Sequence, residues 1–248
     1  MKLLTDIGNS QIKIAQNDNQ KLLKIKSFSI EDIEKFRKYI TKTYAIKSCT
    51  LFYSSVLGDK FNRKIKQTLK GIFISETEFK STKSLMTVRN CYNQPGKLGS
   101  DRWAQIVAAH KIFKKNTMIV SCGSAISIDY VTATGIHKGG LILSGAERYN
   151  NCFLDIHNLK NIKLSNNHNN NSNILQSNTL KQITTGYKVM ISSSIHEIYS
   201  SLCHGGKPKP NLLITGSYSK NISEEERDLV DSTFLMSKSP IIIILRLI

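Results

Sequence analysis

The chain has 248 residues, 40% of them hydrophobic, and a formal net charge of +17. This length supports a substantial core, in one large domain or two small ones. No apolar run approaches the roughly 20 residues that cross a bilayer, and the N-terminus lacks the regions of a signal peptide, so we expect a cytoplasmic protein without a membrane span.

Cysteine content and charge distribution argue against a disulfide-rich protein and against a nucleic-acid-binding protein. The five cysteines are an odd number and include no zinc-like CxxC pair, which predicts reduced thiols rather than a disulfide framework. The lysines are scattered among asparagines and isoleucines, as a general compositional bias would place them. Because the chain has no RNA-binding signature, Arg-rich arm or continuous basic helix, we expect no specific nucleic-acid partner.

The first motif is a strand, a tight turn and a second strand within residues 3–15. The first strand is expected to end at Asp6, and Gly8 and Asn9 are residues that tolerate positive φ in a turn. A carboxylate at a strand end could hold Mg²⁺ directly or through water, while turn amides and the Ser10 hydroxyl could bond phosphate oxygens. The alternative is an ordinary hairpin, since such residues are common in turns.

Alternating and helical periodicities predict the elements that follow in the first half of the chain. We expect strands at Lys21–Phe28, Cys49–Ser54 and Ile72–Ser75, and helices at Ile30–Thr43 and Lys60–Leu69.

A loop rich in turn formers then leads into a helix. Ser100 is the predicted N-cap, which puts Asp101 and Arg102 in the first helical turn, where they can face a ligand. The alternative is a capped helix with a dipole-favoured aspartate and a solvated arginine. Helical spacing predicts one buried face made of Trp103, Ile106, Val107, His110 and Phe113.

The chain then repeats its opening motif. Residues 118–129 can be laid on residues 3–14, with Gly123 on Gly8 and Ser121 on Asp6. Both segments predict a strand, a glycine turn and an alternating strand, and a third strand is expected at Ile136–Leu143. Two such hairpins indicate two related α/β halves, and a cleft between such lobes is a natural nucleotide site.

The remaining elements are predicted from composition and periodicity. We expect a helix at Glu147–Leu159, a polar loop at Ser165–Asn173, a long helix capped by Ser177, a strand at Leu212–Thr215 and a helix at Glu224–Phe234.

Together, four segments resemble the type III pantothenate kinase family: Asp6–Ser10, Pro95–Ala104, Cys122–Ile126 and Gly139–Ile142. The resemblance implies an α/β fold of the duplicated ribonuclease-H-like type, found in the actin-like ATPase and kinase superfamily, with lobes at residues 1–115 and 116–248. It implies transfer of the γ-phosphate of ATP to pantothenate, which gives 4′-phosphopantothenate in the first step of coenzyme A biosynthesis. It also implies a homodimer with the active site at the subunit interface.

Site roles follow from the resemblance, position by position. Asp101 would be the catalytic base, and Ser124 stands where a threonine contacts ATP. The cofactors implied are Mg²⁺ bound with ATP near Asp6, and a monovalent cation, K⁺ or NH₄⁺. The ATP phosphates would be lined by Asp6, Ile7, Gly8, Asn9, Ser10, Gln11, Ile12 and Lys13. Pantothenate would be bound by Tyr92, Gly99, Ser100, Asp101 and Arg102, with Thr179 from the other subunit.

Three departures from the family pattern accompany the resemblance. Ser121 stands where the family usually has the aspartate that helps hold the monovalent cation, Ser144 replaces a usual proline, and the apolar end of the chain differs. These departures and the charge leave open a non-catalytic relative that acts as a transcription accessory factor. An actin-like kinase for another small hydroxyl-bearing substrate is a third possibility. The intact set of acid, arginine and phosphate-hairpin residues favours an active pantothenate kinase.

Overall fold

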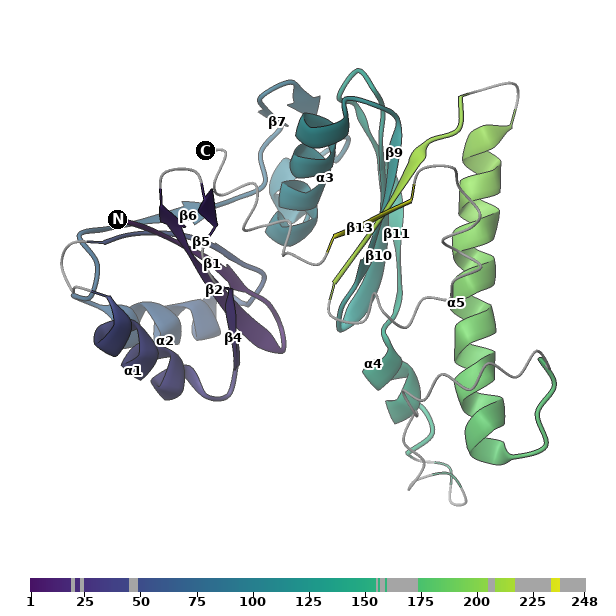
Figure 1. Ribbon diagram of the computed structural model, residues 1–248, viewed down its shortest axis with the longest axis horizontal. Coiled ribbons are helices and arrows are strands. Elements are labelled where there is room, and N and C mark those ends of the chain that lie inside the picture. Colours follow the sequence, from purple (N-terminus) through teal and green to yellow (C-terminus); the bar gives the residue numbers. More distant parts are fainter. Residues whose placement is uncertain are drawn as a thin grey trace. The chain divides into compact units, whose positions relative to one another are not determined.

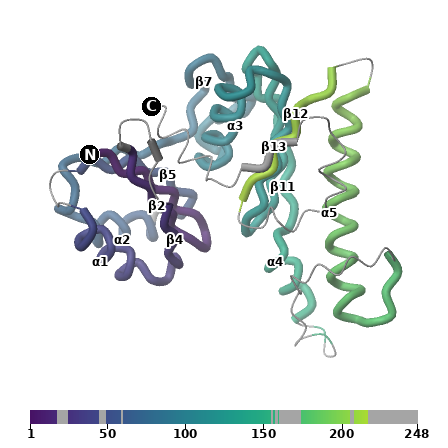
Figure 2. Tube along the Cα trace, viewed as in Figure 1, coloured from purple at the N-terminus to yellow at the C-terminus, as the bar shows by residue number. Residues whose placement is uncertain are grey.

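The computed structural model describes residues 1–18, 21–22, 25–44, 49–154, 156, 159, 174–204, 208–216 and 233–236. These residues form two compact units (Figures 1 and 2). The first contains residues up to Lys114 together with Thr134–Lys138, and the second contains Lys115–Ala133 and the described residues from Gly139 to Met236. The predicted division into residues 1–115 and 116–248 did not include this exchange, in which Thr134–Lys138 belongs to the first unit.

The first unit is built on a mixed sheet with the strand order β3-β2-β1-β5-β6, in which β4 also pairs with β2. The central strand β1 runs antiparallel to β2 and parallel to β5, and β6 continues the sheet in parallel. The strands are β1 (Lys2–Ile7), β2 (Gln11–Asp18), β3 (Lys21–Leu22), β4 (Lys26–Ser29), β5 (Thr50–Ser55) and β6 (Ser75–Phe79).

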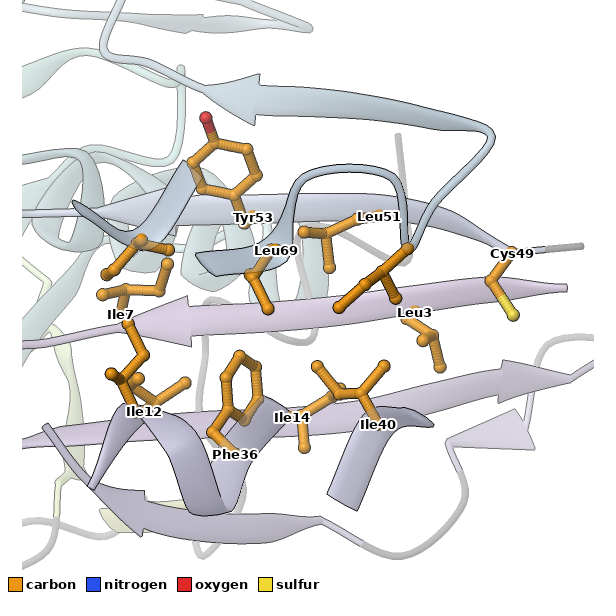
Figure 3. Packing of buried hydrophobic residues seen from close by; sticks show 13 residues of the cluster. Leu3, Ile7, Ile12, Ile14, Phe36, Ile40, Cys49, Leu51, Tyr53 and Leu69 are labelled. Carbon is orange, nitrogen blue, oxygen red and sulfur yellow. The ribbon is translucent and has the colours of Figure 1, made fainter. Parts of the chain in front are cut away.

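Two helices, α1 (Ile33–Thr43) and α2 (Asp59–Leu69), cover one face of this sheet. Residues two apart in a strand share a face, so alternate apolar residues of β1, β2 and β5 point to the helices. Figure 3 shows Phe36 of α1 beside Ile12 and Ile14 of β2, all of them buried. The residues between these apolar positions face the other side of the sheet.

The helix α3 (Ser100–Phe113) belongs to the first unit, and its central part is buried on all sides, not on one face. Each residue from Arg102 to His110 is buried. Gly99, not Ser100, is the N-cap, and it caps without a side chain. The connection before α3 contains the short strands β7 (Ser84–Leu85) and β8 (Val88–Arg89) and a 3-10 turn at Pro95–Lys97.

The second unit has a sheet with the order β11-β10-β9-β12-β13. Its central strand β9 pairs antiparallel with β10 and parallel with β12, and β13 runs parallel to β12. This pattern repeats the pairing of the first sheet, so the predicted duplication is confirmed. The strands are β9 (Thr117–Cys122), β10 (Ala125–Val131), β11 (His137–Ser144), β12 (Asn211–Thr215) and β13 (Thr233–Met236).

The long helix α5 (Thr179–Cys203) covers one face of the second sheet (Figure 1). Its residues Ile191, Ile195 and Tyr199 are buried against Met118 and Val120 of β9 and other apolar residues of that face. Asn178 caps this helix by accepting a hydrogen bond from the amide of Lys181 at 3.2 Å, so the predicted Ser177 cap is wrong. An asparagine one position later satisfies the same free helical amides.

Two predicted elements of the first unit have different bounds. The strand expected at Lys21–Phe28 is two short strands, β3 and β4, which both pair with β2. The strand expected at Ile72–Ser75 begins only at Ser75, because Gly71 takes a φ of 78° and the Ile72 amide bonds back to Leu69, which closes a turn after α2.

Two helical predictions in the second unit are wrong in part. The helix expected at Glu147–Leu159 is the short α4 (Ala146–Asn151), after which hydrogen bonds three residues apart continue the chain as turns. The helix expected at Glu224–Phe234 ends in strand β13, which pairs with β12, and its earlier residues lie outside the described ones. The predicted polar loop at Ser165–Asn173 also lies outside them.

Candidate functional site

The turn after β1 presents polar groups at the surface. Asp6 is half-buried near the end of β1, while Asn9 and Ser10 are exposed. The amide of Gly8 donates to the carbonyl of Gln11 at 2.9 Å, which closes the hairpin. Neither Gly8 nor Asn9 has a positive φ, so the turn forms without the left-handed backbone that these residues would permit. A carboxylate and a hydroxyl at an exposed turn suit a phosphate with its cation.

A pair of serine hydroxyls connects this sheet to α3. Ser54 of β5 is the register partner of Asp6, so both side chains point to the face opposite α1 and α2. The Ser54 hydroxyl is buried and donates to the Ser100 hydroxyl at 2.8 Å, which in turn donates to the carbonyl of Ser55 at 3.1 Å. The end of β1 and the start of α3 therefore lie on one face of one sheet.

The start of α3 holds its aspartate in a fixed orientation. The Asp101 Oδ1 atom accepts the amide of Arg102 at 2.8 Å. A Cβ at Gly99 would lie 2.5 Å from the same oxygen, so a larger residue at the helix cap would make this carboxylate shift. The position is at the positive end of the helix dipole, which favours the ionised carboxylate.

Arg102 is buried, with 7% of its surface exposed, and is not the solvated arginine of the alternative interpretation. Its Nη1 donates to the hydroxyl of Tyr92 at 3.2 Å, so two residues predicted to bind the same substrate are in contact. The ring of Tyr92 stacks on His137, with centroids 6.2 Å apart and planes inclined by 16°. His137 is completely buried, and its Nδ1 is 3.5 Å from the sulfur of Cys91.

Asn90 fixes the backbone on which Tyr92 is carried. Its side-chain nitrogen donates to the carbonyls of Thr82 and Pro95, at 3.2 and 3.3 Å, and its side-chain oxygen accepts the amide of Tyr92 at 3.0 Å. A nearly buried amide with three such bonds holds this loop in one conformation. The loop is therefore a structured support for Tyr92.

The matching hairpin of the second unit is surrounded by glycines. The amide of Gly123 donates to the carbonyl of Ala125 at 3.1 Å. A Cβ at Gly145 would lie 2.6 Å from the carbonyl oxygen of Gly123 and 2.5 Å from that of Ser124, which is too close for any side chain. A Cβ at Gly216 would likewise overlap the backbone of Cys122. Three backbone segments thus approach closely around the turn that carries Ser124.

Ser121 lies in a row of hydroxyl groups across the second sheet. It is the register partner of Ser127 on β10 and of Thr215 on β12, so the three side chains share a face. This is the position that Asp6 and Ser54 occupy in the first sheet. Asp129 is two residues beyond Ser127 and shares the face, so the antiparallel register brings a buried carboxylate closer to Ser121 than the sequence separation suggested.

Thr179 is the first residue of α5 and is exposed. It belongs to the second unit, whereas the other residues predicted to bind pantothenate belong to the first. Its role stays a prediction.

The described residues contain no group of three or more histidine, cysteine, aspartate or glutamate side chains that could hold a metal ion. Mg²⁺ is commonly bound by one or two carboxylates together with substrate phosphates, and not by an all-protein cage. The single carboxylate of Asp6 beside an exposed turn fits that mode of binding. In the described part of the chain, no helix has the length and apolar composition of a membrane span.

The sequence did not single out several residues of this site. Ser54 and Ser55 are two hydroxyl residues at the end of a buried strand. Polar residues at such a position could have indicated that this strand end belongs to the site. Cys91 and His137 lie 46 residues apart and carry no local pattern. Their contact could not be read from spacing.

The two matching sheets give this chain the fold that the actin-like ATPase superfamily shares. Solved structures with the same fold include a Campylobacter jejuni protein named for the Baf family of transcriptional activators, with a TM-score of 0.58 and 21% identity over 97% of this chain and 93% of that one. MreB5 of Spiroplasma citri bound to ADP matches with a TM-score of 0.51 and 10% identity over 99% and 94%. At these identities the likeness shows the fold.

The chain belongs to the type III pantothenate kinase family, whose family model matches residues 2–201. A type III pantothenate kinase of Nitrosococcus oceani is 33% identical over 153 residues, which are 58% of this chain and 57% of that protein. One of Hahella chejuensis is 34% identical over 100 residues, 40% and 41% of the two chains. The matches thus span about half the length of these curated relatives.

Proposed function

We propose that this protein transfers the γ-phosphate of ATP to pantothenate and forms 4′-phosphopantothenate, the first step of coenzyme A biosynthesis. One observation carries the proposal: in a member of this family, the β1 turn with Asp6 and the α3 start with Asp101 and Arg102 lie on one face of one sheet. The hydroxyl contact of Ser54 with Ser100 connects the two strand ends to that helix.

Arg102 recognises pantothenate, and Asp101 takes part in the phosphoryl transfer. The Arg102 guanidinium pairs with the substrate carboxylate, and the Tyr92 hydroxyl restrains that guanidinium. The primary hydroxyl of pantothenate attacks the γ-phosphorus, the bond from that phosphorus to the bridging oxygen breaks, and ADP leaves. Asp101 accepts the hydroxyl proton late in this step, since phosphoryl transfer has a loose transition state.

The turn after β1 binds the phosphates of ATP. Residues Asp6 to Lys13 line them, with Asn9, Ser10 and Gln11 exposed and the side chains of Ile7 and Ile12 buried in the core, and Ser124 contacts the nucleotide from the second hairpin. Asp6 would hold Mg²⁺ together with the phosphates, and the ion would offset their negative charge.

A monovalent cation, K⁺ or NH₄⁺, would bind near Ser121. The residues of that face fit such an ion weakly, because Ser121, Ser127 and Thr215 offer neutral hydroxyl oxygens. Asp129, a buried carboxylate on the same face, has its Oδ1 beside Gly140.

The active form would be a cytoplasmic homodimer in which Thr179 completes the neighbour's pantothenate site. An odd number of cysteines without a paired pattern in the sequence suits a reducing compartment. Exposed apolar residues lie on β11, namely Leu141 and Ile142, and on α5, namely Val189 and Met190, where another subunit could cover them.

The test is a coupled assay of the purified protein with ATP, Mg²⁺ and pantothenate, with the product identified by mass spectrometry. We expect ADP release that depends on pantothenate. ADP release without pantothenate, but with another small alcohol, would support a different kinase of the superfamily. No turnover with any alcohol, from a folded protein that binds ATP, would favour the non-catalytic relative.

A further inference from the structure

A five-residue segment, Thr134–Lys138, contains the turn after β10 and the first two residues of β11, but it folds with the first unit. The carbonyl of Gly135 accepts the amide of Arg89 at 2.8 Å, and Ile136 forms a parallel bridge with Arg89. These bonds attach the segment to β8, six residues before the start of the loop turn at Pro95. The segment is therefore built into the unit that carries Tyr92 and Arg102.

Gly135 allows the close approach that this attachment needs. Its φ is +80°, and a Cβ there would overlap the carbonyl oxygen of Thr87 and lie 3.2 Å from Nε2 of His110 in α3. Only glycine fits without strain at such a position. The backbone that leads to His137 is thus fixed between β8 and α3.

His137 connects this fixed backbone to Tyr92, a residue predicted to bind the substrate. It is completely buried, its ring stacks on Tyr92, and its Nδ1 contacts the Cys91 sulfur. The Tyr92 hydroxyl then accepts a hydrogen bond from Arg102. A continuous line of contacts runs from the segment to the guanidinium.

We infer that His137 is a positioning residue for pantothenate binding, which holds the Tyr92 ring so that the Tyr92 hydroxyl orients the Arg102 guanidinium toward the substrate carboxylate. The inference rests on the proposed function, in which Arg102 pairs with that carboxylate. Guanidinium–carboxylate pairing is directional, so a loose guanidinium loses part of the bond.

The first experiment compares His137→Ala and His137→Phe with a matched control, Lys138→Ala, at the exposed neighbouring position. His137→Ala removes the ring, and we expect its KM for pantothenate to rise about tenfold while its KM for ATP changes less than about twofold. His137→Phe keeps a flat ring against Tyr92 and should restore the KM for pantothenate to within about threefold of wild type. An equal loss in His137→Ala and His137→Phe, or an equal rise in both KM values, would overturn the inference.

The second readout is the preference for a carboxylate. Wild type should favour pantothenate over its primary amide, and both His137→Ala and Tyr92→Phe should reduce that preference. Tyr92→Phe keeps the stacked ring and leaves the buried histidine in place, so it tests the same line of contacts if His137→Ala fails to fold. Full preference retained in Tyr92→Phe would contradict the inference, whereas a wild type without pantothenate-dependent turnover would overturn the proposed function itself.

Discussion

The carboxylate of Asp101 is oriented by its own helix, since it accepts the next amide and lies against the Gly99 backbone. A base held in place in this way is an effective acceptor for a substrate hydroxyl.

We predict that Asp101→Asn lowers kcat by about 10²–10⁴-fold, the usual loss when a general base is removed. Asparagine also suits the first turn of a helix, so the melting temperature should stay close to that of wild type. Steady-state kinetics and a thermal melt check both parts. Near wild-type turnover in the purified variant would show that Asp101 is not the base.

Ser121 lacks the negative charge that Asp6 carries at the matching position of the first hairpin. It occupies the position of Asp6 but offers a neutral oxygen. A full negative charge at contact distance holds a monovalent cation more firmly than a hydroxyl dipole does.

We predict a shallow dependence of wild-type activity on K⁺, and a steeper dependence with half-saturation at lower K⁺ in Ser121→Asp. The measurement is a K⁺ titration of both forms at fixed ionic strength, with Asp129→Asn as a comparison. If wild type responds to low K⁺ as sharply as Ser121→Asp, then Ser121 has no part in cation binding.

At the scale of elements, the contact between β5 and α3 is the connection that brings the two predicted motifs together. It includes a hydrogen bond from the buried Ser54 hydroxyl to the half-buried Ser100 hydroxyl, which donates to the carbonyl of Ser55. A buried donor left without its partner is costly, so this contact constrains where α3 begins.

We predict that Ser54→Ala destabilises the protein by about 1 kcal/mol and lowers kcat more than it raises the KM for ATP, because the start of α3 is released. Ser84→Ala, at an exposed position on β7, is the control. Chemical denaturation and steady-state kinetics provide the two measurements. Loss of stability with unchanged kcat would limit the serine pair to a structural role.

At the scale of the whole molecule, the site is expected to need two chains. Thr179 at the start of α5 is exposed, and the edge strand β11 exposes Leu141 and Ile142, at 50% and 64% of their surfaces. Exposed apolar side chains on an edge strand favour a covering partner.

We predict a two-fold homodimer by light scattering, and a shift toward an inactive monomer in Ile142→Asp, since a buried unpaired charge opposes association. Lys138→Ala serves again as the nearby control. An active monomer in wild type would contradict both the dimer and the role of Thr179.

The net charge of +17 also belongs to the whole molecule. If it reflects composition, duplex DNA should bind only weakly, and the affinity should fall steeply with salt as counterion release requires. A fluorescence anisotropy titration at several salt concentrations measures this. Sequence-specific binding that survives physiological salt would favour the transcription accessory function instead.

The sequence by itself determined the two hairpins, the duplication and the helix that begins beside Asp101. Each of these features depends on residues that are close together in the sequence. They are a strand period of two, a turn rich in glycine or asparagine, and a helical period after a loop. Helix caps and strand ends were less accurate, as with Ser177 and the strand at Ile72–Ser75, because neighbouring residues can satisfy the same backbone groups.

Only the tertiary structure decided how these pieces support the site. The sheet pairs Asp6 with Ser54, and Ser54 then reaches Ser100 across 46 residues of sequence. Arg102 could have been solvated, but in the structure it is buried and donates a hydrogen bond to Tyr92. The segment with His137 joins the first unit from the middle of the second. Such contacts depend on the packing of distant residues, and local periodicity carries no information about them.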